Sequence, residues 1–203
     1  MNLMYIYSRV LKKLRGAALS GSEIHKDSKV ESGCTVINTV FDRHSFCGYD
    51  CLFNNCEVGS FTSIASNVKV GGSMHPMEFV STSPVFLSHK DSVKTKLAKH
   101  DYYNIPKTVI GCDVWIGEGV YIKSGVKVGH GAVIGMGTVV TKDVPAYSVF
   151  CGNPGKVVKY RFDENIREAL LNSGWWDMPD AKLKELGNLI TSPVEFLRAL
   201  GKL

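Results

Sequence analysis

The sequence predicts a mainly β chain that winds into a parallel β-helix with triangular coils. An aliphatic residue recurs at every sixth position, in a series formed by Ile110, Ile116, Ile122, Val128, Ile134 and Val140. A small or β-branched residue follows four places after each of these, at Val114, Val120, Val126, Ala132, Thr138 and Val144. A step of six fits neither the 3.6-residue period of an α-helix nor the two-residue period of a long strand. Each six-residue unit is therefore one short flat side, and three sides close a coil.

Stacking of the coils should place both series in columns inside a prism, because parallel strands of successive coils pair about 4.8 Å apart. The same step runs upstream through Phe46, Leu52, Val58, Ile64 and Val70. An earlier stretch at Ile24, Val30 and Val36 begins the stack, and an irregular turn near residues 37–45 is expected to absorb a change of register. Cys34 and Cys56 fall on the small inward position and are predicted to be core thiols.

Bulk composition favours one main domain with many tight turns. The 203 residues are 44% hydrophobic and include 20 glycines, which suits one buried core better than two domains. The net charge of +5 is not concentrated in a run of like charges, so nucleic-acid binding is not implied. Six cysteines without a CxxC pair favour reduced thiols in a cytoplasmic protein. A zinc site from Cys47, Cys51 and Cys56 lacks a fourth ligand, and no metal is expected.

Residues 1–19 predict an N-terminal amphipathic helix. One helical face carries Leu3, Tyr7, Val10, Leu11 and Leu14, and the basic residues lie largely on the other face. The order of apolar and basic residues is wrong for a signal peptide, and the segment is too polar to span a membrane. We expect this helix to cover the end of the core. The alternative is a weak peripheral membrane contact through residues 1–15.

The six-residue repeat is interrupted inside the β-helix domain, which is predicted over residues 20–160. Residues 74–107 form an inserted loop, and a long irregular excursion from a regular solenoid is typical of a functional segment. His75 lies where the last regular strand exits, so a rigid scaffold should hold it within reach of solvent. Neutral imidazole accepts a proton from an attacking hydroxyl, which makes His75 a candidate general base. Tyr102 and Tyr103 are predicted either to line an acceptor pocket or to anchor the loop.

Residues 161–203 predict a C-terminal helical cap. Residues 163–173 indicate a short helix that Gly174 ends, and a capping box at residues 192–195 opens another helix. The cap is expected to cover the open end of the prism and to protect its last strand. Trp175 and Trp176 are predicted to be packing anchors in this cap.

Ordered motifs over roughly residues 40–185 resemble the hexapeptide-repeat xenobiotic acetyltransferases, which modify chloramphenicol and streptogramins. They equally resemble the O-acetyltransferases of bacterial surface polysaccharide synthesis. The motifs are Ile64–Val70 continuing to His75-Pro76, Val109–Gly117, Val139–Pro145, Gly152–Lys156 and Trp175–Pro179. The resemblance implies a left-handed coil, although right-handed crossovers are the general preference. It also implies acetyl-CoA as cosubstrate, a homotrimer with active sites between subunits, and His75 as the general base.

The resemblance further implies a set of residues that contact coenzyme A. Trp115 and Gly117 would flank the thiol end, and Gly135 with the Thr141-Lys142 pair would line the pantetheine arm. Lys156 and Lys159 would meet the nucleotide phosphates, since lysine pairs well with phosphate, and Arg161 is a further candidate. The alternative interpretations are a solvated rim for the lysines and simple packing for Trp115.

These expectations combine into an acetyl-CoA-dependent O-acetyltransferase that acts by direct transfer on a hydroxyl of a sugar or polysaccharide precursor. A carbonyl or carboxylate is expected to fix the tautomer of His75. The sugar acceptor is favoured because residues 79–84 and the N-terminal helix look more like the surface-polysaccharide relatives. Antibiotic O-acetylation and amino-sugar N-acetylation remain alternatives. Two alternatives come from other classes of protein. One is a purely structural scaffold. The other is a zinc-dependent β-helix carbonic anhydrase, for which His75, His89, His100 and His130 lack convincing spacing.

Overall fold

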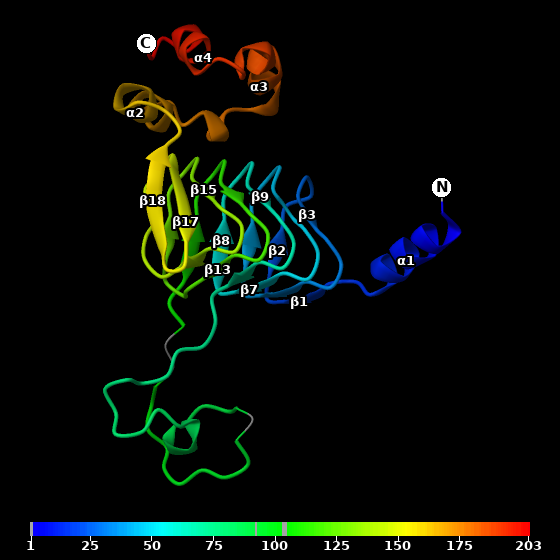
Figure 1. Ribbon diagram of the computed structural model, residues 1–203, viewed down its shortest axis with the longest axis vertical. Coiled ribbons are helices and arrows are strands. Elements are labelled where there is room, and N and C mark those ends of the chain that lie inside the picture. The colour runs from blue at the N-terminus through cyan, green and yellow to red at the C-terminus, as the bar shows by residue number, and fades with distance from the viewer. Residues whose placement is uncertain (1, 92, 103–104) are drawn as a thin grey trace.

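The body of the molecule is a three-sided parallel solenoid (Figure 1). The computed structural model describes residues 2–91, 93–102 and 105–203. Within these residues each of three sheets takes one strand from successive coils. The first sheet contains β1 (Ala18–Ser20), β4 (Thr35–Ile37), β7 (Leu52–Asn54), β10 (Lys69–Val70), β13 (Tyr121–Ile122) and β16 (Val139–Val140). The second contains β2 (Glu23–Ile24), β5 (Val40–Phe41), β8 (Cys56–Val58), β11 (Thr108–Ile110) and β14 (Lys127–Val128).

The third sheet is the longest, because a hairpin extends it beyond the last coil. It contains β3 (Lys29–Val30), β6 (Phe46–Cys47), β9 (Ser63–Ile64), β12 (Trp115–Ile116), β15 (Val133–Ile134), β17 (Ser148–Gly152) and β18 (Gly155–Tyr160). Strand β18 runs antiparallel to β17, while the other pairs are parallel. The last parallel strand is therefore paired on its outer side by its own hairpin partner, and β18 forms the edge of the sheet.

The downstream coils confirm the predicted columns. Both predicted series from Ile110 onward are buried, with Ile116, Val120, Ala132 and Val140 fully inaccessible. Here Val109 pairs with Lys127, eighteen positions further on, so the coils up to Val140 have three equal sides of six residues. The last coil is shorter, because Val133 pairs with Val149, sixteen positions further on. The predicted core thiols Cys34 and Cys56 are also buried in the same cluster.

The upstream prediction was wrong by one position at Phe46 and Leu52. Phe46 is 48% exposed, and the inward residues are Phe41, Cys47 and Phe53 instead. Val36 pairs with Phe53, seventeen positions further on, so these coils are one residue shorter than the downstream ones. The missing residue is at the corner between the first and second sheets, where Asn38 and Asn55 adopt left-handed backbone conformations. Asparagine tolerates this region, which allows a tighter corner.

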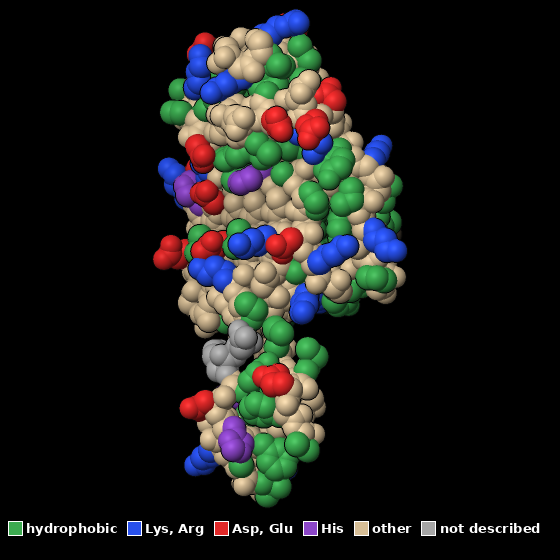
Figure 2. Space-filling view, turned by 90° about the vertical axis from the view of Figure 1, so that its left-hand side faces the viewer, with side chains coloured by type: hydrophobic (Ala, Val, Ile, Leu, Met, Phe, Trp, Pro, Cys, Tyr) green, Lys and Arg blue, Asp and Glu red, His purple; other side chains and the backbone are tan. Residues whose placement is uncertain are grey.

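The inserted loop leaves the body at this same corner, between β10 of the first sheet and β11 of the second. We call this corner column the loop edge. The loop projects away from the prism and contains the short helix η1 (Pro84–Phe86) (Figure 1). Two hydrogen bonds fix its base: Ser124 Oγ donates to the Gly72 carbonyl at 2.6 Å, and Asn55 Nδ2 donates to the Ile105 carbonyl at 2.6 Å. The loop is thus a separate lobe on a fixed stem (Figure 2).

The C-terminal cap consists of α2 (Glu164–Ser173), η2 (Trp175–Asp177), α3 (Asp180–Leu186), η3 (Gly187–Leu189) and α4 (Pro193–Ala199). The predicted stop of α2 is confirmed, because Gly174 adopts a left-handed conformation. The predicted cap of α4 is confirmed as well, because Ser192 accepts a hydrogen bond from the Glu195 N–H.

The expectation that the cap covers the end of the prism was wrong. The helices lie along the corner column between the second and third sheets, which we call the cap edge (Figure 1). Arg43 donates to the Trp176 carbonyl at 2.7 Å, and the His130 ring stacks on the Trp176 ring with centroids 4.4 Å apart. Phe61 contacts Trp175 with centroids 5.2 Å apart. Both tryptophans anchor the cap as predicted, but they do so across several coils rather than over the last one.

The N-terminal helix α1 (Leu3–Leu14) is confirmed, but it does not cover the core. It projects beyond the first coil, and none of its residues is buried (Figure 1). Among the described residues, no helix combines the length and the apolar character that crossing a bilayer requires. The interpretation of α1 as a cover for the end of the prism is therefore wrong for this chain.

Docking of the cap on His130 should make folding stability sensitive to acid. Burial lowers the pKa of His130 below its usual 6.5, partly offset by Asp177, and Nδ1 accepts a hydrogen bond from the Cys112 N–H at 3.0 Å. The unfolded chain thus binds a proton at His130 at a higher pH than the folded protein does. Stability from this residue is present above the unfolded pKa of about 6.5 and is lost as the pH falls from there through the lower pKa of the folded protein.

The free energy of unfolding can be measured with urea from about pH 7.5 to about pH 5. As the pH falls, this free energy should decrease less steeply in His130→Gln than in the wild type. Glutamine keeps an acceptor for the Cys112 N–H but does not titrate. Equal slopes for the two proteins would show that His130 does not couple the cap to pH.

Candidate active site

The stem of the inserted loop sets the position of His75. Strand β10 ends at Val70, and Gly71 turns the chain out of the coil with φ of +83°. A Cβ at this position would lie 2.1 Å from the Asn54 carbonyl oxygen, so only glycine fits so close to the preceding coil. His75 follows four residues later, near the fixed stem.

The imidazole of His75 is oriented by the loop backbone. Its Nδ1 lies 2.8 Å from the Thr82 carbonyl oxygen, which only accepts hydrogen bonds. Nδ1 therefore carries the proton, and the lone pair is on Nε2. The ring is exposed, so Nε2 is open to an incoming hydroxyl. The expectation that a carbonyl or carboxylate fixes the tautomer is met here by a main-chain carbonyl.

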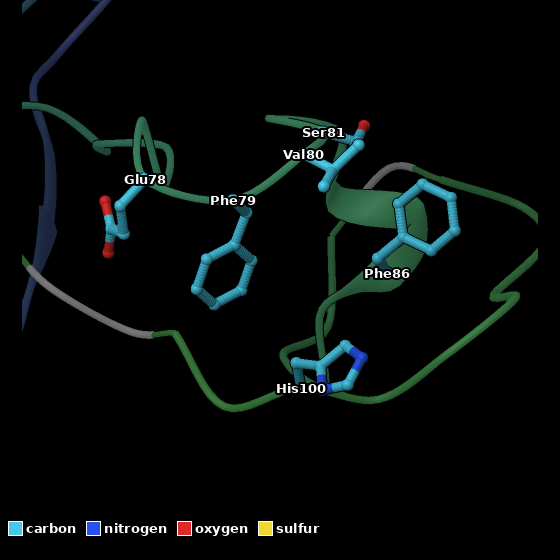
Figure 3. Close-up of a pocket in the computed structure, with 6 residues that line it drawn as sticks. All are labelled: Glu78, Phe79, Val80, Ser81, Phe86 and His100. Carbon is cyan, nitrogen blue, oxygen red and sulfur yellow. The ribbon is translucent and has the colours of Figure 1, made fainter.

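A hollow of about 620 Å³ lies in the same loop (Figure 3). Its lining residues are Glu78, Phe79, Val80, Ser81, Phe86 and His100. The ring of Phe79 points toward His100 in Figure 3 and meets it edge to face, with centroids 6.3 Å apart. The lining is mainly apolar with a few polar groups, which is the usual character of a site for a small organic molecule.

Tyr102 anchors the loop beside this hollow. Its hydroxyl donates to the His75 carbonyl at 3.3 Å, and its ring packs against Phe79 with centroids 5.9 Å apart. These contacts support the anchoring interpretation of Tyr102. Tyr103, for which the same two interpretations were weighed, lies outside the described residues.

Trp115 and Lys159 occupy one row on the outer surface of the third sheet. The register runs from Trp115 to Val133, from Val133 to Val149, and from Val149 to Lys159. Trp115 is 58% exposed. Three strand spacings separate the ends of this row, or roughly 14 Å. Lys156 is exposed on the same terminal strand, opposite Cys151. The third sheet thus places an aromatic ring and two cations along one surface.

Gly117 and Gly135 occupy equivalent corners of successive coils. A Cβ on Gly117 would lie 2.6 Å from the Met136 backbone nitrogen, and a Cβ on Gly135 would lie 2.5 Å from the Cys151 sulfur. Both glycines are therefore required for coil stacking alone. They border the third sheet next to Trp115, and their N–H groups donate to the Ile134 and Phe150 carbonyls of the following strands.

Thr141, Lys142 and Arg161 occupy other surfaces. The Thr141-Lys142 pair follows β16 and is exposed on the loop edge, the edge from which the His75 loop leaves. Arg161 lies at the cap edge, where its Nη1 ion-pairs with Asp113 at 3.0 Å and donates to the Gly131 carbonyl at 2.7 Å. Its guanidinium is therefore already engaged by two groups of the prism.

Within one chain, the structure does not bring His75 and Trp115 together. In a three-sided prism, the edge between the first and second sheets is opposite the face formed by the third sheet. His75 belongs to that edge and Trp115 to that face. The predicted site residues therefore form two separate groups, one at the loop edge and one on the third sheet.

Buried thiols form the one group of three potential metal ligands among the residues that the structure describes. Cys34, Cys47 and Cys51 place their sulfurs within 4.8 Å of one another inside the prism. The zinc set considered from the sequence had Cys56 in place of Cys34. Burial raises the pKa of Cys56 to about 12, and Cys34 donates to the Gly48 carbonyl at 3.1 Å. All four are buried, free cysteines of the core. The four histidines of the carbonic anhydrase alternative do not form such a group in the described segments.

Sequence reasoning missed two features of this site. The Thr82 carbonyl is a backbone group, and no residue type signals its position. The hollow around Phe79 depends on how the loop folds on itself, although the clustering of Phe79, Phe86 and Tyr102 in one polar insertion was a usable signal.

Comparison with known proteins agrees with this architecture. The family described as "Bacterial transferase hexapeptide (six repeats)" matches residues 107–142. A solved structure, the acetyltransferase domain of PglB from Neisseria gonorrhoeae in complex with acetyl coenzyme A, shares the fold with a TM-score of 0.52. It is 20% identical and covers 76% of this chain and 63% of its own chain, a similarity that supports the fold alone.

Curated relatives carry the family assignment. A chloramphenicol acetyltransferase of Agrobacterium fabrum is 41% identical over 138 residues, and the match covers 66% of this chain and 66% of that protein, slightly under two thirds of its length. A probable macrolide acetyltransferase of Lysinibacillus sphaericus is 34% identical over 148 residues, which are 71% of this chain and 81% of that protein. The six-residue repeat, the inserted loop and these matches agree. The chain belongs to the xenobiotic acetyltransferase family of hexapeptide-repeat proteins.

Proposed function

We propose that this protein transfers an acetyl group from acetyl-CoA to a hydroxyl of a small acceptor, with His75 as general base. The observation that carries the proposal is the 2.8 Å contact between His75 Nδ1 and the Thr82 carbonyl. In the neutral ring, this contact places the lone pair on Nε2, at the exposed end. A base held in one tautomer on a fixed stem is what direct acyl transfer requires.

The proposed reaction is a single displacement. His75 Nε2 takes the proton of the acceptor hydroxyl while the hydroxyl oxygen attacks the thioester carbonyl carbon. The C–S bond then breaks, and the imidazolium returns its proton to the departing sulfur. An N–H of the coil backbone would stabilise the negative oxygen, and orientation of the two substrates supplies much of the rate. No covalent enzyme intermediate is involved.

The third sheet has features that suit coenzyme A. Its outer row offers Trp115 for the pantetheine end and Lys159 roughly 14 Å away for phosphate, with Lys156 on the same strand. Gly117 and Gly135 lie at the adjoining corner, next to Trp115 on the third sheet. We retain these residues as the proposed coenzyme contacts and omit Arg161, which the cap occupies.

We infer that the complete site lies between subunits of a homotrimer. The loop edge carries His75 and the Thr141-Lys142 pair, and the opposite face carries Trp115. Association of the loop edge of one subunit with the third sheet of the next would bring the two groups together. The exposed rings of Trp115 and Phe46 on the third sheet are consistent with a surface that a neighbour covers.

The names of the relatives favour an antibiotic as the acceptor over the sugar expected from the sequence. A chloramphenicol acetyltransferase and a probable macrolide acetyltransferase are among them. We therefore propose chloramphenicol as the first acceptor to test, with streptogramins as the next. A sugar or polysaccharide hydroxyl is the second candidate, since the helix α1 on which that preference rested in part is present.

The free cysteines fit a reducing, cytoplasmic location.

Replacement of His75 tests the proposed base. His75→Ala should lower kcat for acetylation of a competent acceptor by about 10²–10⁴-fold, while binding of coenzyme A, measured by calorimetry, changes little. His25→Ala is the matched control, because His25 lies on the first coil, far along the chain from the loop. Undiminished turnover in His75→Ala would show that His75 is not the general base.

Mixing two inactive variants tests the site between subunits. His75→Ala retains Trp115, and Trp115→Glu retains His75. Trimers that contain both chains should regain activity well above the sum of the separate variants, because some interfaces then combine an intact loop with an intact third sheet. Mixed trimers without any recovered activity would place both groups in one subunit.

A further inference from the structure

The helix α1 presents a continuous apolar surface to solvent. Residues three and four apart on one side of the helix form this surface, which we call the α1 apolar face: Leu3, Ile6, Tyr7, Val10, Leu11 and Leu14. None of them is buried, and Leu3 is 82% and Leu14 76% exposed. Such a face is costly to leave in water, so a partner is expected to cover it.

The polar side of α1 is the side that contacts the prism. Lys12 Nζ lies 4.4 Å from the centre of the Tyr49 ring, and Arg15 forms an ion pair with Asp50. A hollow between helix and body is lined by Tyr5, Ser8, Arg9, Lys12 and Tyr49, all outside the α1 apolar face. A helix that packed on the core would turn its apolar side toward the prism, whereas α1 turns its apolar side toward solvent. The contacts to Tyr49 and Asp50 therefore hold the apolar face away from the protein.

The charge around this face identifies the kind of partner. Residues 1–22 contain Arg9, Lys12, Lys13 and Arg15 and no acidic residue. A second copy of α1 packed against the first would bring these cations together without an anion to pair with. An anionic lipid surface supplies both an apolar layer and negative phosphates. At twelve residues, or roughly 18 Å, the helix is too short to span a bilayer and fits an orientation parallel to its surface.

We propose that α1 binds the surface of an anionic lipid bilayer. The α1 apolar face inserts between the lipid headgroups, and Lys13, which flanks this face and has no ion-pair partner among the described residues, contacts the lipid phosphates. The prism then sits with its first coil nearest the membrane. This role does not depend on which acceptor the enzyme acetylates.

Vesicle cosedimentation of the full chain tests the proposal. The protein should pellet with phosphatidylcholine vesicles that contain about 30% phosphatidylglycerol and much less with pure phosphatidylcholine, and the difference should shrink at high salt. Leu11→Gln with Leu14→Gln should weaken binding by about tenfold or more, because two apolar side chains leave the lipid. Glutamine favours helix about as well as leucine does, so α1 should still form.

Ser8→Gln is the matched control on the polar side and should bind vesicles as the wild type does. Circular dichroism and thermal unfolding should be the same for all variants, since α1 contributes nothing to the core. Equal binding to anionic and neutral vesicles, or unchanged binding by the double leucine variant, would overturn the proposal. If the wild type ignores vesicles and the double variant dissociates in sedimentation velocity, a second copy of the chain covers the face instead.

Discussion

The close stacking of the coils through their inward columns is the constraint on which the rest of the structure depends. Ile116 and Ile134 are buried partners in successive coils, so their neighbours Trp115 and Val133 must point outward. The register of the interior thus fixes which residues the surface presents. A shift by one position, as at Phe46 and Cys47, exchanges an inward residue for an outward one. The packing of the core therefore determines where functional side chains lie on the surface of such a prism.

Each edge and face of the prism has a separate task. The loop edge releases the segment with His75, where Gly71 and the Ser124–Gly72 hydrogen bond fix the stem. The cap edge holds the C-terminal helices through Arg43, His130 and Arg161. In the part of the chain that the structure describes, Phe46 and Trp115 on the outer face of the third sheet are left exposed. This division explains why the chain, although folded, does not by itself assemble the two groups of site residues.

The sequence predicted most fully those parts in which local spacing and burial agree. From Ile110 to Val140, glycines at regular corners and equal sides of six residues make the pattern unambiguous. Upstream it failed at Phe46 and Leu52, because both are apolar and the shortened corners at Asn38 and Asn55 change the step from six to five. The hand of the coil was taken from the resemblance, since either hand gives the same period.

Features that depend on long-range contacts were beyond such reasoning. The carbonyl that orients His75 belongs to Thr82, and only the folded loop brings them together. The amphipathic pattern of α1 identified its apolar side correctly but not what that side meets, because the pattern carries no information on the orientation of the helix. The ion pair of Arg161 was likewise unpredictable, because Asp113 comes from a coil forty-eight residues earlier.

The central claim is that His75 of one subunit acts on a thioester held against the third sheet of another. The most direct measurement is a crystal structure of the protein with coenzyme A. The account predicts that the coenzyme sulfur lies about 3–4 Å from His75 Nε2 of one subunit. The pantetheine arm of the coenzyme should then lie along Trp115 of a neighbouring subunit. A coenzyme bound through residues of a single chain, or with its sulfur remote from His75, would contradict it.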